Sequence, residues 1–236
     1  MGWLNRAKVD IFRHANRHLS SPPCQQPGEH LIATTRLIIL LNIFCCLEAG
    51  SLRQLDSLIT TALEGTNQHP GLDYTLETIS LATPFIEWAY VLDLHSKAWP
   101  DGDPDQQEFA QLATIGLVSV QLGVGLLKYV VNRKRPARRY QPRLWNTRIT
   151  PSWPSGHAAS SAAFATIAAH QHPSAGPLIY AYLLASAYSQ VYVGNHYAFD
   201  VLGGLIVGGA VGLWILDTMD DTGANPAVIS IYLPLD

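Results

Sequence analysis

Apolar segments long enough to form buried or membrane-crossing helices recur along the 236-residue chain. Residues 201–216 contain no charged side chain and approach the roughly 20 residues that a bilayer-spanning helix needs. Residues 112–127 form a second uncharged segment, and residues 178–193 form a third that is rich in tyrosine and alanine. These three segments are the strongest predicted membrane helices.

Three further segments complete a predicted set of six helices. Residues 31–47 are mostly apolar, and Arg36 lies near enough to one end to extend its charge to the membrane surface. Residues 158–169 are short and have small side chains, so we expect them in the interior. Residues 76–94 are the weakest membrane segment, because they carry three acidic residues and Pro84, which would kink a helix.

This pattern predicts an all-α fold, a six-helix transmembrane bundle with the loops that carry chemistry at one membrane face. We expect residues 1–30 to form an N-terminal tail and residues 31–217 to form the bundle. Residues 218–236 then form a C-terminal tail. No internal repeat divides the bundle further.

Two segments indicate how the helices are arranged. Residues 52–63 place apolar side chains at helical spacing between the first two bundle helices, which predicts an amphipathic helix at the membrane interface. Gly204, Gly208 and Gly212 recur at four-residue spacing, so one face of their helix allows close approach of a second helix. Such a stripe serves packing within one bundle or between two.

Charge is distributed unevenly along the chain, although the formal net charge is only -3. Every Lys and Arg lies at or before Arg148, in the N-terminal tail or in residues 128–148 for the most part. With six spans and the basic tail inside, residues 128–148 lie outside and the acidic loop 99–108 lies inside. Basic charge outside contradicts the positive-inside rule unless it binds an anion. A nucleic-acid partner is only weakly supported, and we expect none.

Three short motifs follow one another, each at a predicted helix end. Lys128 is followed after six residues by Arg135 and a proline, Pro-Ser-Gly-His occupies residues 154–157, and His196 precedes Asp200 by four residues. In antiparallel helices with short connections, these ends lie on the same face of the bundle. Residues far apart in the sequence are therefore expected to meet in one pocket.

The first two motifs have the chemistry of a phosphate site. A transferred phosphoryl group carries negative charge on three oxygens, so its catalysis depends on positioning and on cationic or N–H donors. Lys128 and Arg135 supply the charge. The backbone N–H groups of Ser155, Gly156 and His157 begin a predicted helix, whose N-terminus favours anions.

The remaining motif supplies a nucleophile and an acid. The Asp200 carboxylate can hold one ring N–H of His196, four residues earlier, and leave the other nitrogen free to attack phosphorus. His157 then protonates the leaving oxygen and later deprotonates water. Each motif alone is weak evidence, but their joint presence in this order at helix ends favours a phosphate-type site.

These residues resemble the signature of the type-2 phosphatidate phosphatase superfamily, which includes lipid phosphate phosphatases, soluble acid phosphatases and vanadium haloperoxidases. The signature is Lys-x6-Arg-Pro, Pro-Ser-Gly-His and Ser-Arg-x5-His-x3-Asp. The resemblance implies that His196 is the phosphorylated nucleophile, Asp200 its partner and His157 the acid and base. No metal ion or other cofactor is implied. The implied phosphate ligands are Lys128, Arg135, Ser155 and Gly156, with Gln190 at a further ligand position.

Gln190 is the departure from the family pattern, which has arginine at that position. Glutamine still donates a hydrogen bond, but a charge-assisted bond of about 1.5–3 kcal/mol becomes a neutral one of about 1 kcal/mol. Activity is then lower, unless another cation compensates. Arg138 and Arg139 are the candidates within the same basic segment.

The sequence therefore predicts a metal-independent phosphatase that hydrolyses a phosphomonoester or diphosphate of a membrane lipid, of the phosphatidate or polyprenyl diphosphate type. Its expected partners are the phosphorylated lipid and the membrane. The expected location is a bacterial-type inner membrane, crossed several times, with the active site on the non-cytoplasmic face. The three cysteines have no zinc-ligand spacing.

Two alternatives remain at this stage. Gln190 and the polar second helix are also compatible with a phosphate-binding pseudoenzyme or membrane scaffold. The mean hydropathy of +0.10 is low for a protein that crosses the membrane many times, and it favours a soluble acid phosphatase or haloperoxidase-like enzyme.

Overall fold

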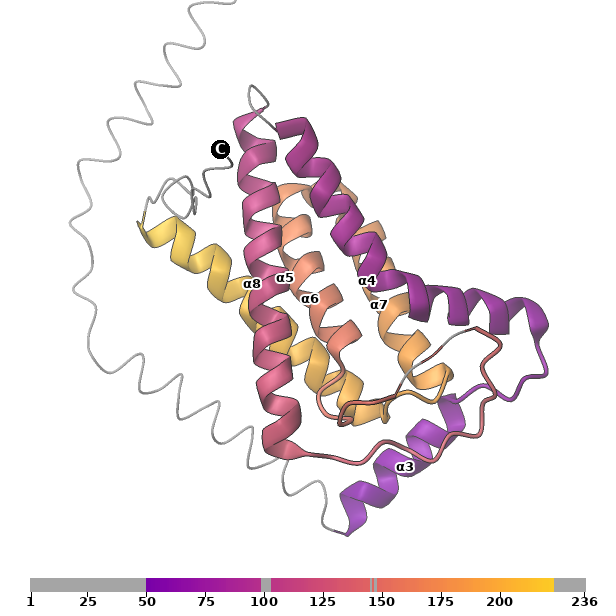
Figure 1. The fold of residues 1–236 in the computed structure, drawn as a ribbon. Coiled ribbons are helices and arrows are strands. Elements are labelled where there is room, and N and C mark those ends of the chain that lie inside the picture. The colour runs from indigo at the N-terminus through magenta and orange to yellow at the C-terminus, as the bar shows by residue number, and fades with distance from the viewer. Residues whose placement is uncertain (1–49, 99–102, 145, 147, 223–236) are drawn as a thin grey trace, which may run out of the picture. The chain divides into compact units, whose positions relative to one another are not determined.

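The computed structural model describes residues 50–98, 103–144, 146 and 148–222. Within these residues the fold is all-α, as predicted, with six α-helices and no strand (Figure 1). Residues 31–47, the N-terminal tail and residues 223–236 lie outside the described part of the chain. The helices are α3 (Ser51–Leu63), α4 (Pro70–Ala98), α5 (Pro104–Val131), α6 (Gly156–Gln171), α7 (Gly176–Tyr192) and α8 (Ala198–Thr222), with a short 3-10 turn at Pro173–Ala175.

Each predicted segment within the described residues corresponds to one helix. Helices α4, α5, α6 and α8 contain their predicted bundle segments and extend beyond them, α7 ends at Tyr192, one residue before the end of the predicted segment 178–193, and α3 matches the predicted amphipathic helix. Helix α4 continues through Pro84 and bends along its length (Figure 1). Among the described helices, α5 and α8 are long and apolar enough to cross a membrane.

Helix α6 packs against α4, α5, α7 and α8, and its alanine-rich sequence is largely buried. The predicted glycine stripe is the reason that α8 packs closely on it. A Cβ atom built on Gly208 would lie 2.0 Å from the carbonyl oxygen of Ala159, and one on Gly204 would lie 2.5 Å from that of Ser155. Glycine is therefore required where α8 crosses α6, and this contact fixes the start of α6 against α8.

Local sequence signals set the helix ends that carry the motifs. Helix α5 begins after Asp103, whose side chain accepts a hydrogen bond from the Asp105 N–H at 3.1 Å. It ends at Val131, and Asn132 caps it in the left-handed conformation with φ of 48°. This boundary leaves Lys128 in the last turn of α5. Ser155 caps the start of α6 in the same way.

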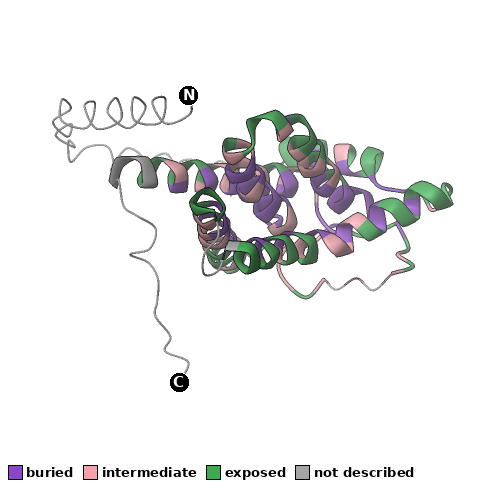
Figure 2. Cartoon of the chain, turned by 90° about the horizontal axis from the view of Figure 1, so that it is seen from above, coloured by how far each residue is buried: buried purple, intermediate pink, exposed green. Residues whose placement is uncertain are grey.

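Helix α3 lies at the end of the bundle where the loop between α5 and α6 runs (Figure 1). Its polar residues Asp56 and Thr60 are buried. Its leucines are exposed, whereas a soluble amphipathic helix buries its apolar residues. The bundle helices are likewise exposed on their outer sides and buried where they face one another (Figure 2). The exposed leucines of α3 are Leu52, Leu55, Leu58 and Leu63.

Candidate functional site

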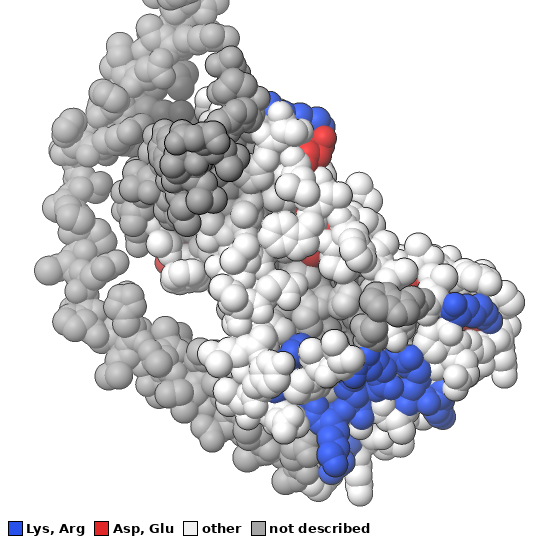
Figure 3. All heavy atoms as spheres, viewed as in Figure 1, with Lys and Arg blue, Asp and Glu red and all other residues white. Residues whose placement is uncertain are grey.

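The three motifs meet at one cavity of about 430 Å³. It lies at the end of the bundle where Lys and Arg side chains gather on the surface (Figure 3). Six of the eight predicted site residues line it, and the other two, Ser155 and Asp200, are buried and bonded to each other. The six are Lys128, Arg135, Gly156, His157, Gln190 and His196.

Two cations from the first motif reach the cavity. Lys128 is buried, and its Nζ donates to the carbonyl oxygen of Pro151 at 2.7 Å. The Arg135 guanidinium is held by the carbonyl oxygens of Thr150 and Asn195, each at 2.8 Å. Burial, together with the charge of Arg148, lowers the pKa of Arg135 to about 10. Arg135 therefore stays charged at neutral pH in a fixed orientation.

The second motif forms the start of α6. Gly156 and His157 line the cavity, so the positive end of the helix dipole faces it. The N–H of Ser155 instead donates to the backbone oxygen of Asp200 at 2.9 Å, and its hydroxyl caps the helix by accepting from the Ala158 N–H at 3.4 Å. Ser155 thus connects α6 to α8, and the N–H groups available to an anion at this end come from Gly156 and His157.

His196 lies in the connection between α7 and α8, with one ring nitrogen toward a cation and the other toward a carboxylate. Its Nε2 is 3.4 Å from Nη1 of Arg135. Its Nδ1 is 3.7 Å from Oδ2 of Asp200, longer than a hydrogen bond, and finds no hydrogen-bond partner among the described residues. Burial, reinforced by Arg135 and Lys128 and opposed by Asp200, lowers the pKa of His196 to about 4. The ring is therefore neutral at physiological pH.

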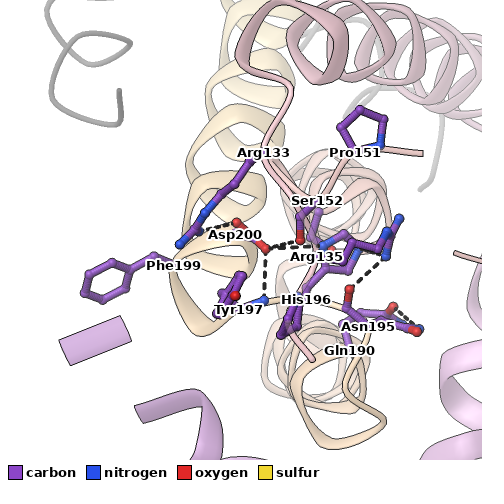
Figure 4. A network of polar contacts seen from close by, with 12 residues as sticks. Arg133, Arg135, Pro151, Ser152, Gln190, Asn195, His196, Tyr197, Phe199 and Asp200 are labelled. Atoms are coloured by element: carbon purple, nitrogen blue, oxygen red, sulfur yellow. Dashed lines mark hydrogen bonds and ion pairs between the residues drawn. The ribbon is translucent and has the colours of Figure 1, made fainter. Parts of the chain in front are cut away.

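The carboxylate of Asp200 is the centre of a buried polar network (Figure 4). Its Oδ1 accepts from Arg133 at 2.5 Å, and its Oδ2 accepts from the Ser152 hydroxyl and from the Tyr197 N–H at 2.9 Å. Arg133 also donates to Oδ2 of Asp56 on α3 at 2.7 Å. Sequence reasoning missed Arg133, Ser152 and Asp56. The only signal for Asp56 is an acidic residue within an otherwise regular amphipathic helix.

Gln190 is fully buried in a chain of amide contacts. Its Nε2 donates to the Ser80 hydroxyl at 3.0 Å, and its Oε1 accepts from Nδ2 of Asn195 at 3.1 Å. Arg138 donates to Oδ1 of the same Asn195 at 2.6 Å. Arg139 points away from this group and bonds to the Thr61 carbonyl oxygen at 2.8 Å. Of the two arginines considered as replacements, only Arg138 reaches the network around Gln190.

Comparisons with known proteins agree with this architecture. Residues 109–223 match the model of the PAP2 superfamily. No curated protein matches this chain. The fold resembles the crystal structure of a transmembrane PAP2-type phosphatidylglycerolphosphate phosphatase from Bacillus subtilis, with a TM-score of 0.64 and 19% identity over 80% of this chain and 96% of that one. It also resembles LpxE from Aquifex aeolicus, with a TM-score of 0.54 and 22% identity over 70% of this chain and 93% of that one. At these identities the two structures establish the fold.

Proposed function

We propose that this chain, whose residues 109–223 match the model of the PAP2 superfamily, is a metal-independent phosphatase acting on a phosphorylated membrane lipid. One observation carries the proposal. Lys128, Arg135, the start of α6 and the imidazole of His196 all line the same cavity. This is the combination that an in-line attack on a phosphoryl group needs: cations and N–H groups around the oxygens, with a neutral nucleophile in reach.

In the proposed first step, Nε2 of His196 attacks phosphorus while the bond from phosphorus to the lipid oxygen breaks. The leaving oxygen takes a proton from His157, and the phosphoryl group stays on His196. In the second step, His157 takes a proton from water, whose oxygen attacks the phosphohistidine. Inorganic phosphate leaves, and both imidazoles return to their first state. Lys128 and Arg135 hold the phosphoryl oxygens throughout.

Asp200 supports the charge that His196 acquires during attack. Its carboxylate lies 3.7 Å from Nδ1, and bonds of this kind are often long in the free enzyme and shorten in the complex. Since Nδ1 has no other partner among the described residues, Asp200 is the group toward which its proton is directed. The neutral state of His196 at physiological pH leaves Nε2 available for attack.

Location in a membrane with the site on the non-cytoplasmic face is part of the same proposal. Two apolar helices and the fold shared with a transmembrane phosphatase support the membrane location. The basic loop has local counterparts: Arg133 pairs with Asp56, and Arg143 pairs with Asp73 and Glu77. The basic residues of this loop therefore have roles in the fold and in phosphate binding, and these roles are the reason we propose for their place on the outer face, against the positive-inside rule.

Phosphate release tests the proposal. The purified protein in detergent is supplied with phosphatidate or with a polyprenyl diphosphate, with and without a chelator, beside the His196→Ala variant. We expect release that persists with chelator and is lost in the variant. Equal release by His196→Ala ends the phosphohistidine mechanism, and release that disappears with chelator ends the metal-free one.

A second candidate, a phosphate-binding pseudoenzyme or scaffold, rests on the buried glutamine at position 190. Gln190→Arg separates the two. A rise in turnover from near zero favours the disabled protein, whereas wild-type turnover that already depends on His196 favours the enzyme. Recovery of the protein without detergent in the soluble fraction would favour the soluble phosphatase or haloperoxidase-like alternative instead.

A further inference from the structure

Beyond the motif residues, we propose that Asp56 and Arg133 are positioning residues that hold the Asp200 carboxylate toward His196. The inference rests on the proposed function, because it assigns a role in the reaction of the same site. It makes α3 part of the active site, although α3 lies before the residues 109–223 that match the PAP2 superfamily.

Arg133 uses the two ends of its guanidinium fork on two carboxylates. Nη1 donates to Oδ1 of Asp200 at 2.5 Å, and Nη2 donates to Oδ2 of Asp56 at 2.7 Å. Only 6% of the Arg133 side-chain surface is exposed, and the exposed fractions of the Asp56 and Asp200 side chains are 1% and 0%. The guanidinium also lies over the ring of Tyr197, 4.3 Å from its centroid. Arg133 is therefore fixed on three sides.

Asp56 is held as firmly as the arginine it binds. Its Oδ1 accepts from the Phe199 N–H at 2.9 Å, and on the same helix Thr60 Oγ1 accepts from the Ala198 N–H at 2.9 Å. These N–H groups belong to the first turn of α8, where no partner within the helix exists. Helix α3 thus caps the N-terminus of α8 at the two residues that directly precede Asp200. Asp56 fixes both the start of α8 and the arginine that orients its carboxylate.

The consequence for Asp200 is geometric. Arg133 occupies Oδ1 and leaves Oδ2 as the oxygen that faces His196, at 3.7 Å from Nδ1. Rotation of the carboxylate would break the bonds that Oδ2 makes to Ser152 and Tyr197. A buried set of three charges is a poor device for stability, since apolar residues of similar volume often serve as well. Its position directly behind Asp200 suits a role in orientation.

The charges that face His196 determine how Asp56 and Arg133 affect its protonation during the reaction. Within the described chain these are Lys128 from α5, Arg135 from the loop, His157 from α6 and Asp200 from α8, with Arg133 and Asp56 behind Asp200. Loss of the Asp56 charge makes the surroundings of His196 more positive, whereas loss of the Arg133 charge makes them more negative. The two changes therefore move the protonation of His196 in opposite directions.

The test compares Asp56→Asn and Arg133→Gln with a matched control, Asp73→Asn. Asp73 is a fully buried carboxylate that binds Arg143 and the Tyr192 hydroxyl, and it does not line the cavity. For both test variants we expect kcat to fall about 10- to 100-fold with KM within about threefold, since orientation affects the transition state most. The acid limb of kcat/KM shifts by about half a pH unit, downward in Asp56→Asn and upward in Arg133→Gln. Asp73→Asn leaves the acid limb of kcat/KM unchanged.

Arg133→Lys tests whether the loss of kcat comes from misfolding, because it keeps the buried charge but cannot bond both carboxylates at once. We expect it to retain the wild-type unfolding midpoint in detergent and still lose kcat. Acid limbs that coincide in all variants, or a kcat loss in Asp56→Asn no larger than in Asp73→Asn, overturns the inference.

Absence of any phosphatase activity in the wild type would overturn the proposed function instead. The inference is then decided by NMR titration of isotope-labelled histidine, with His196→Ala assigning the resonance. The His196 midpoint must move in opposite directions in Asp56→Asn and Arg133→Gln and stay unchanged in Asp73→Asn. Equal midpoints in all four proteins would refute it.

Discussion

Adding one methyl group at Gly208 should damage the bundle, whereas the same change at the next residue should not. The Cβ of Gly208→Ala would lie 2.0 Å from the oxygen, 2.8 Å from the carbonyl carbon and 2.9 Å from the Cα of Ala159. All three atoms are backbone, so no side chain can turn away. Ordinary contact begins at 3.4 Å, and 3.4 minus 2.0 leaves about 1.4 Å by which α6 and α8 must separate.

Gly209→Ala is the matched control, because a Cβ there meets nothing within 4 Å. Both substitutions gain the same helix propensity, about 1 kcal/mol. The difference between them therefore isolates the close approach, which costs about 1–3 kcal/mol when a packed core is overfilled. We expect Gly209→Ala to be neutral or stabilising and Gly208→Ala to be destabilised relative to it by that amount.

Thermal unfolding in detergent measures the difference in stability, and phosphate release measures its effect on the site. Separation of α6 from α8 should stretch the 2.9 Å bond from Ser155 to Asp200, so kcat/KM should fall in Gly208→Ala even at temperatures where the protein stays folded. Equal unfolding midpoints for the two variants would refute the packing of α8 on α6 described above.

Three further outcomes follow from the site. The acid limb of the wild-type kcat/KM, below which His196 is protonated and cannot attack, should lie below about pH 5, because burial lowers the pKa of His196 to about 4; an acid limb near pH 6.5 in a pH profile would contradict this. Lys128→Met should lower kcat/KM about 10- to 150-fold through loss of a charge-assisted bond of about 1.5–3 kcal/mol, measured by initial rates, while Lys128→Arg retains more activity. Arg138→Met should reduce turnover through Asn195, which it binds at 2.6 Å, whereas Arg139→Met, which changes an arginine 57% exposed, should leave it unchanged.

The helices were predictable because each has a periodic or uniformly apolar sequence. Even two of the three acidic residues that made 76–94 the weakest segment have internal partners. Glu77 accepts from the backbone N–H groups of Arg143 and Leu144, and Glu87 accepts from the Ser161 hydroxyl at 2.6 Å. These partners lie more than 60 residues away in the sequence, so the local pattern contains no sign of them.

The convergence of the motifs at one end was also predictable, because antiparallel packing of successive helices brings alternate helix ends together, even across the long connection 132–155. The sequence pattern does not predict the residues that hold these motifs in place. Residues 52–63 indicated an amphipathic helix, but periodicity alone does not tell which face is buried. In the structure Asp56 and Thr60 are the buried residues of this helix, and both accept hydrogen bonds from the start of α8. The leucines of α3 are exposed instead, and the Asp56–Arg133–Asp200 network depends on Asp56 being on the buried side.

Support from residues distant in the sequence also accounts for the glutamine at position 190. An arginine there would be a third cation in a cavity that already holds Lys128 and Arg135. Gln190 instead joins Asn195, whose Oδ1 takes the charge-assisted bond from Arg138 and whose backbone oxygen takes one from Arg135. A positive charge next to this corner thus comes from Arg138, a part-buried arginine of the loop that binds Asn195. A neutral residue on α7 therefore costs the site less than the motif alone suggests, because the loop carries the charge that the helix lacks.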